Sequence, residues 1–205
     1  MKRLLLLLVR LLGGFRLARA MTADGLRILC YHGFAIADED EFRPALYMPG
    51  ELFARRLDLL LQRGFTLLPL GTALELQASG RLPRDAVAIT IDDGWYSTLS
   101  VAAPLLAARE TPAMLYVTTY YVDKPGPVFR VCMGYMFWKT TRDRADFSRL
   151  GVPGLRTQDG CDLRDPRSRE SALQAIDDYG EGECDEAGRV VLSRRVAAAL
   201  GVDYD

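Results

Sequence analysis

Histidine is almost absent from this sequence: His32 is the only one in 205 residues. A mechanism or metal site that needs two imidazoles therefore cannot be built from this chain alone. Acidic and basic residues nearly balance, at a net charge of −1, and the chain carries no zinc-finger or RNA-binding pattern, so nothing favours a nucleic-acid partner. With 49% apolar and 26% charged residues, the composition is that of one globular domain with a sizeable core.

Cysteine is also scarce, and its spacing excludes the commonest metal motifs. Cys30, Cys132, Cys161 and Cys184 form no C-x-x-C pair, so they do not make a zinc site among themselves. A disulfide between Cys161 and Cys184 and four free thiols both stay open, and the spacing favours free thiols. This usage is compatible with a reducing compartment and excludes no other.

The first 24 residues form a basic, leucine-rich segment that lacks the roughly 20 apolar residues of a membrane-spanning helix. Three interpretations stay open: a helix lying on a membrane surface, a signal peptide, and a helix packed on the domain. Residues 1–20 favour the first, because on a helix most leucines face away from most basic residues. The short run Leu4–Val9 and the triplet Ala18-Arg19-Ala20 favour the second. The corresponding locations are the cytoplasm, with or without membrane association, or export.

Residues 25–122 alternate strand and helix patterns, which is typical of an α/β fold with right-handed crossovers. The apolar run Ala86–Ile91 predicts a strand buried on both faces, as in a parallel sheet covered by helices. The other expected elements are buried strand Arg27–Tyr31, loop Asp38–Arg43, helix Glu51–Arg63, strand Phe65–Leu68, a short helix opened by a Thr72–Glu75 capping box and ending at Gly80, helix Ser97–Glu110 with a kink or late start at Pro104, and strand Ala113–Thr118.

Residues 123–205 break this rhythm. They contain irregular stretches rich in Gly, Pro, Arg and Asp, and two helical patterns at 168–178 and 185–199. We therefore expect this segment to be an insertion or accessory segment, largely loop and helix.

Two adjacent carboxylates, Asp92 and Asp93, follow the clearest strand and precede Gly94. Ligands and chemistry collect at the carboxyl ends of parallel strands. Neighbouring side chains there diverge, so that one carboxylate can bind a cation and the other can accept a proton from water. The alternative is that Asp-Asp-Gly is only a turn at a strand end in an unrelated α/β protein.

The sequence Thr90-Ile91-Asp92-Asp93-Gly94-Trp95 resembles the T-F-D-D-G signature of NodB-type polysaccharide deacetylases, which belong to a carbohydrate esterase family. Three further landmarks stand in the family's order. They are the strand end Tyr31-His32, the helix carrying Phe53, Leu57 and Leu60 before Gly64-Phe65, and the strand Pro112–Val117, which is similar to P-A-T-F-F-V. The resemblance covers about Leu26 to Val122.

This resemblance implies part of a distorted (β/α) barrel, a divalent metal such as zinc, and hydrolysis of N-acetyl groups on a polysaccharide or N-acetylated oligosaccharide. Carried over by position, Asp92 would be the general base and Asp93 a metal ligand. His32 is a candidate supporting residue near the metal or substrate, although a structural histidine with satisfied hydrogen bonds is the favoured alternative. Trp95 would line the substrate groove. The family's H-x-x-x-H motif, which supplies two imidazole ligands, is missing.

We therefore expect a truncated, inactive relative of these enzymes, with three or four of about seven barrel strands. The last strand, Ala113–Thr118, would then have an unpaired apolar edge. The alternative is a noncatalytic glycan-binding or membrane-associated scaffold module derived from the same fold.

Overall fold

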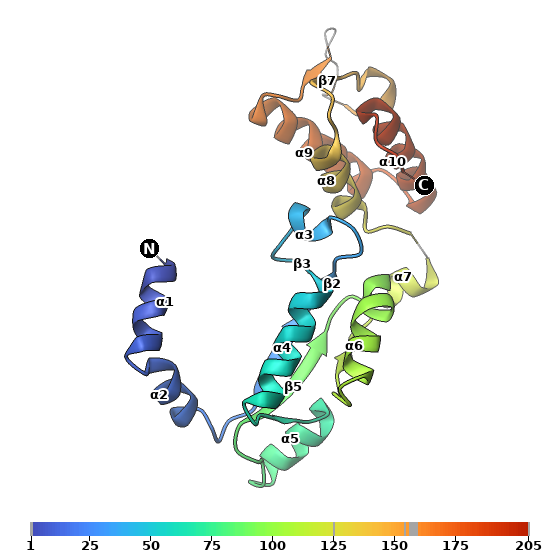
Figure 1. Cartoon of the computed structure of the whole chain (residues 1–205). Helices are drawn as coiled ribbons and strands as arrows, with labels where there is room; N and C mark the ends of the chain where they lie inside the picture. Colours follow the sequence, from blue (N-terminus) through green and yellow to red (C-terminus); the bar gives the residue numbers. More distant parts are fainter. Residues whose placement is uncertain (1, 125, 154, 156–159, 205) are drawn as a thin grey trace. The chain divides into compact units, whose positions relative to one another are not determined.

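The computed structural model describes residues 2–124, 126–153, 155 and 160–204, which divide into two compact units, Met1–Thr119 and Tyr120–Asp205 (Figure 1). Each unit has its own cluster of buried apolar side chains. The first unit contains the parallel sheet and all four candidate site residues.

Strand β5 (Ala86–Ile91) is the centre of a four-stranded parallel sheet, and all six of its side chains are buried. Strand β1 (Arg27–Tyr31) pairs along one edge of β5, from Arg27 opposite Val87 to Tyr31 opposite Ile91. The other edge is shared by two short strands: β4 (Thr66–Leu67) pairs with the start of β5 and β6 (Met114–Leu115) with its end. This confirms an α/β fold, but the described residues form an open sheet and no closed barrel.

Helices cover one face of this sheet. Helix α4 (Gly50–Gln62) buries Phe53 and Leu57, and it packs with the π-helical turn η1 (Thr98–Ala102) and helix α6 (Ala103–Ala107). Helical backbone begins at Tyr96 and runs through η1 into α6, so the late start expected at Pro104 is not found. The irregularity before Pro104 is the π-helical turn η1. The side chains of Tyr31, Phe34, Phe53, Leu57, Ile89, Ile91, Ala102 and Leu106 form the core on this face.

The opposite face of the sheet is partly open. Along β1 the side chains alternate, so that Ile28 and Cys30 are exposed while Tyr31 is buried. The expectation that Arg27–Tyr31 is a buried strand is therefore wrong for this face of β1, because no described element covers it. Both residues of β6 are exposed too, and β5 is its only partner among the described strands.

Two other local expectations fail. The segment 38–43 contains a short helix, α3 (Glu39–Phe42), because the Glu39 carboxylate accepts hydrogen bonds from the backbone N–H groups of Ile36 and Ala37 and orders the preceding turn. Helix α5 (Leu70–Ala78) begins two residues before the expected cap at Thr72, and this earlier start buries Leu70 against the sheet. A separate parallel pair follows β1 along the chain and is formed by β2 (Gly33–Phe34) and β3 (Tyr47–Met48).

The N-terminal segment forms two helices, α1 (Lys2–Leu11) and α2 (Gly14–Met21), separated at Gly13 by a left-handed backbone with φ of 74°. Most of their large apolar side chains are exposed: Leu4, Leu5, Leu6, Leu7, Leu8, Leu11, Leu12, Phe15, Leu17 and Met21. None of the described helices combines the length and apolar character needed to traverse a bilayer.

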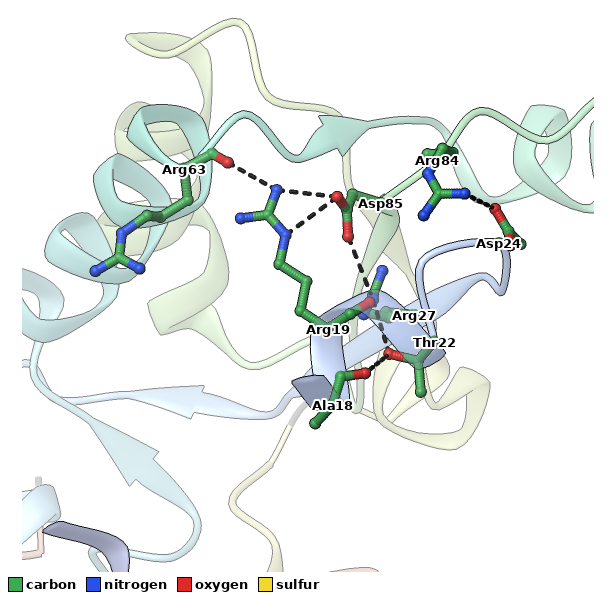
Figure 2. A network of polar contacts seen from close by, with 8 residues as sticks. All are labelled: Ala18, Arg19, Thr22, Asp24, Arg27, Arg63, Arg84 and Asp85. Atoms are coloured by element: carbon green, nitrogen blue, oxygen red, sulfur yellow. Dashed lines mark hydrogen bonds and ion pairs between the residues drawn. The ribbon is translucent and has the colours of Figure 1, made fainter. Parts of the chain in front are cut away.

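Arg19 joins α2 to the base of the sheet, as Figure 2 shows. Its Nη2 lies 2.9 Å from the Asp85 carboxylate and 2.9 Å from the Arg63 carbonyl oxygen, and its guanidinium stacks 4.3 Å from the centre of the Phe65 ring. Arg27 lies 3.3 Å from the other Asp85 oxygen. The hydrogen bonds from Arg19 hold the pKa of Asp85 below its usual value.

The second unit contains five helices among its described residues. They are α7 (Thr119–Asp123), α8 (Phe129–Lys139), the 3-10 turn η2 (Ser148–Leu150), α9 (Pro166–Gly182) and α10 (Glu186–Leu200), with a small antiparallel pair, β7 (Arg144–Ala145) and β8 (Cys161–Asp162). Asp165 and Asp185 cap α9 and α10 by accepting hydrogen bonds from backbone N–H groups in their first turns. The four cysteines are free thiols.

Candidate functional site

The site is built at the carboxyl ends of two neighbouring strands, β1 and β5. The parallel register places Tyr31 opposite Ile91, and the Asp92 N–H extends the ladder by donating to the Tyr31 carbonyl oxygen over 2.9 Å. The next residue on each strand is therefore a polar one, His32 on one side and Asp92 on the other. Their side chains meet: His32 Nε2 lies 3.9 Å from Asp92 Oδ2.

Cys30 reaches the same point from β1. Side chains two residues apart on a strand share a face, so Cys30 and His32 point to the same side of the sheet. The Cys30 thiol donates a hydrogen bond to Asp92 Oδ2 over 3.2 Å. Partial burial, together with this hydrogen bond, raises the pKa of the Cys30 thiol above its usual value.

Asp93 turns the other way because the backbone makes a tight left-handed turn. Asp93 and Gly94 both have positive φ, at 71° and 73°, and the Gly94 N–H donates to the Asp92 carbonyl oxygen over 3.0 Å. A β-carbon at Gly94 would lie 3.0 Å from Val117 Cγ1, so glycine suits this position in both conformation and space. The turn leaves the Asp93 carboxylate exposed, where it accepts a hydrogen bond from Trp95 Nε1 over 3.0 Å.

Trp95 is held in place by Tyr47 from β3, whose ring meets the indole edge-on at 5.7 Å. Tyr47 is buried, and this burial raises its pKa to about 12, so it stays a neutral phenol near neutral pH. Its ring also lies against Gly33, where a side chain would have no room. The buried hydroxyl of Ser97 accepts a hydrogen bond from the Phe34 N–H. This bond connects β2 to the segment that follows β5.

Both carboxylates open onto a hollow of about 490 Å³ on the partly open face of the sheet, within the range typical of small-ligand sites. Its walls combine apolar and polar groups from β1, β5, the start of α5 and the residues after β6. The lining residues are Ile28, Leu70, Thr90, Asp92, Asp93, Tyr116, Val117 and Thr118.

The structure brings His32 and Asp92 together at this edge, and Asp93 lines the same hollow as Asp92. Trp95 contacts Asp93 and Tyr47 and is not among the residues described as lining the hollow. Sequence reasoning missed Cys30, although the pattern Cys-x-His at the end of a predicted strand was a usable signal. Alternate residues on a strand share a face, so the two side chains had to point together.

The metal site implied by the family resemblance does not fit this chain. That site joins the carboxylate at the Asp93 position to two imidazoles, and the sequence contains a single histidine. Among the described residues, one group of three potential ligands lies close enough to share a cation: Cys30, His32 and Asp92, whose ligand atoms are all within 4.8 Å of one another. Asp93 is not in that group.

Comparisons with known proteins give structural matches only. No protein-family model and no curated protein matches the chain. A de-N-acetylase from Aggregatibacter actinomycetemcomitans is 23% identical, with 49% of this chain and 40% of that chain covered and a TM-score of 0.43. IcaB from Ammonifex degensii is 32% identical, with coverage of 46% and 38% and a TM-score of 0.41. The Streptococcus pyogenes deacetylase PplD, solved in complex with acetate, is 16% identical, with coverage of 83% and 80% and a TM-score of 0.44.

The chain spans about two fifths of the length of the first two of these proteins. Over about half of its own length, the chain is similar to solved structures described as a de-N-acetylase, IcaB and a deacetylase domain.

Proposed function

We propose that the first unit carries the carboxylate half of a deacetylase site that acts on N-acetylated amino sugars of a polysaccharide. The observation that supports this is the position of Asp92 and Asp93. Both follow a fully buried parallel strand, and both open onto the same hollow, which is large enough for a sugar ring and its acetamido group.

The chemistry assigns different tasks to the two carboxylates. Asp92 would accept a proton from a water molecule as the water oxygen attacks the acetamide carbonyl carbon. Cleavage of the carbon–nitrogen bond, with that proton passed to the departing nitrogen, would then give acetate and the free amine of the sugar and restore the Asp92 carboxylate. His32, 3.9 Å from Asp92, would support the charge on that carboxylate, and exposed Asp93 would be the cation ligand that the motif implies.

The same hollow explains why we expect the isolated chain to be inactive. Attack on an amide produces an oxyanion, and electrostatic stabilisation of this oxyanion usually makes the largest single contribution to the rate enhancement. None of the side chains described as lining the hollow is cationic, and two are carboxylates that would repel the oxyanion. A positively charged group that stabilises the oxyanion would have to be added to the hollow before turnover could occur.

Sugar binding without turnover gives the direct test. In a Trp138→Phe background, Trp95 is the only tryptophan and lies against Asp93, so its emission reports on this end of the sheet. We expect oligomers of N-acetylglucosamine to cause a saturable change in Trp95 emission, weakened by Asp92→Asn and unaffected by Glu75→Gln, an exposed carboxylate on α5 outside the hollow. The absence of any saturable change would contradict the proposed substrate class.

An acetate-release assay on the same oligomers, with zinc or cobalt present, tests the second half of the proposal. We expect no release above background from the purified chain. Release that disappears in Asp93→Asn would show that the chain is catalytically competent and would refute the expected inactivity. Sugar binding that survives substitution of both Asp92 and Asp93 by alanine would favour a noncatalytic binding module instead.

A further inference from the structure

We propose that Cys30, His32 and Asp92 form a cation site of their own, suited to zinc or another thiophilic divalent metal and distinct from the position that the family motif implies. This inference does not depend on the proposed deacetylase function. It concerns the binding of a metal ion by three side chains at the ends of β1 and β5.

The spacing of the three ligand atoms carries the inference. In tetrahedral coordination, zinc–ligand distances of about 2.0–2.3 Å place neighbouring ligand atoms about 3.3–3.5 Å apart. Cys30 Sγ lies 3.2 Å and His32 Nε2 lies 3.9 Å from Asp92 Oδ2, and the three atoms lie within 4.8 Å of one another. The Cys30–Asp92 pair already has this spacing, and closing the other separations needs shifts of up to about 1.3 Å, within the reach of side-chain rotation.

The backbone already fixes most of this arrangement. Cys30 lies in β1, and His32 and Asp92 directly follow Tyr31 and Ile91, the last paired residues of β1 and β5, whose register is set along the whole length of both strands. The Asp92 N–H is held by the Tyr31 carbonyl oxygen, and the Tyr31 side chain is anchored in the core. The ligands therefore stand on regular structure, and little further ordering is needed when a cation binds.

The chemical character of the set selects the metal. A thiolate, an imidazole and a carboxylate are all common zinc ligands, whereas calcium and magnesium prefer oxygen alone. Binding would replace the S–H bond of Cys30 with a sulfur–metal bond and release the proton to solvent. Cys30 is exposed, and His32 and Asp92 are partly exposed, so a fourth coordination position stays open to water.

Cobalt(II) titration of the purified, reduced chain tests this proposal without any substrate. Cobalt bound to a thiolate gives a near-ultraviolet charge-transfer absorption that carboxylate and imidazole ligands alone do not give. We expect this band to saturate at one equivalent, to disappear in Cys30→Ser and to remain in Cys132→Ser, a matched control for a thiol in the second unit. Zinc should displace the cobalt and bleach the band.

The remaining ligands are tested by affinity. Loss of even an outer partner of a metal ligand costs about 10- to 100-fold in affinity, so His32→Asn and Asp92→Asn should each weaken cobalt binding at least tenfold. Asp93→Asn should change it less than about twofold, since Asp93 lies outside the ligand group. A missing thiolate band, a band that persists in Cys30→Ser, or an equal loss in Asp93→Asn and Asp92→Asn would overturn the site. Circular dichroism of each variant shows that the loss is not unfolding.

Discussion

Replacing Phe53 with alanine tests whether the core beneath β1 supports the candidate site. Phe53 is fully buried, at 0% exposure, and its ring lies 5.0 Å from the Tyr31 ring and 4.7 Å from the Phe34 ring. Truncating a buried phenylalanine typically costs about 3–5 kcal/mol, and two aromatic contacts are lost here at once. We therefore expect a loss near the upper end, about 4–5 kcal/mol, in the unit that contains the parallel sheet.

Urea unfolding can resolve this effect because each compact unit contains one tryptophan, Trp95 in the first and Trp138 in the second. With a denaturant slope of about 2 kcal/mol per molar urea, Phe53→Ala should lower the midpoint reported by Trp95 by about 2 M in the Trp138→Phe background. The midpoint reported by Trp138 in the Trp95→Phe background should stay nearly unchanged. Ile176→Ala, at a fully buried position of the second unit, should do the reverse.

Two results would refute this reasoning. One is a shift of less than about 0.5 M in the Trp95 midpoint, which would mean that the Phe53 site collapses or was never well packed. The other is an equal shift of both midpoints, which would mean that the two cores unfold as one cooperative structure.

Three further predictions concern the turn, the base of the sheet and the N-terminus. Gly94→Ala should destabilise the first unit by about 1–2 kcal/mol in the same urea assay, because φ is +73° and Val117 is close; no loss would contradict the turn. The Arg19 ion pair contributes stability above the usual pKa of Asp85 and loses it as pH falls through the lowered pKa of the folded state. Arg19→Gln should therefore lower the melting temperature more at pH 7 than at pH 3, where only its contacts with Arg63 and Phe65 are lost in full. Deleting residues 2–12, which spares Arg19, should abolish sedimentation with anionic lipid vesicles; undiminished sedimentation would exclude a membrane role for α1.

The sequence was sufficient to predict the central strand but not its surroundings. Ala86–Ile91 is apolar on both faces, and all six of its side chains are buried in a strand that has partners on each edge. Arg27–Tyr31 has a similar apolar composition, yet Ile28 and Cys30 are exposed. Burial of a given face depends on which other segment covers it, and composition within the strand does not contain that information.

Local signals failed where tertiary contacts outweighed them. The box at Thr72 has the residue types of a helix cap, but starting α5 at Leu70 buries a leucine, and burying such a side chain is worth about 1.5–3 kcal/mol. A cap is typically worth about 1 kcal/mol, so the earlier start is the more stable choice. At the site, Asp92 and Asp93 could be found from sequence because a strand and a glycine turn flank them, whereas the approach of Cys30 depends on the register between β1 and β5.

The two proposals meet at the Asp92 carboxylate, and chemistry makes them compete there. A general base must accept a proton, but a carboxylate oxygen that coordinates a divalent cation has a much lower proton affinity. Cys30 and His32 both approach the same oxygen, Oδ2, so a metal held by this group would occupy the atom that hydrolysis would use. Asp93, turned away by its left-handed backbone and bound to Trp95, takes no part in that group. Cys30 therefore decides between metal binding and general-base catalysis at Asp92. With the Cys30 thiol, this end of the sheet favours a bound metal. Without the thiol, Asp92 is a base beside a single imidazole.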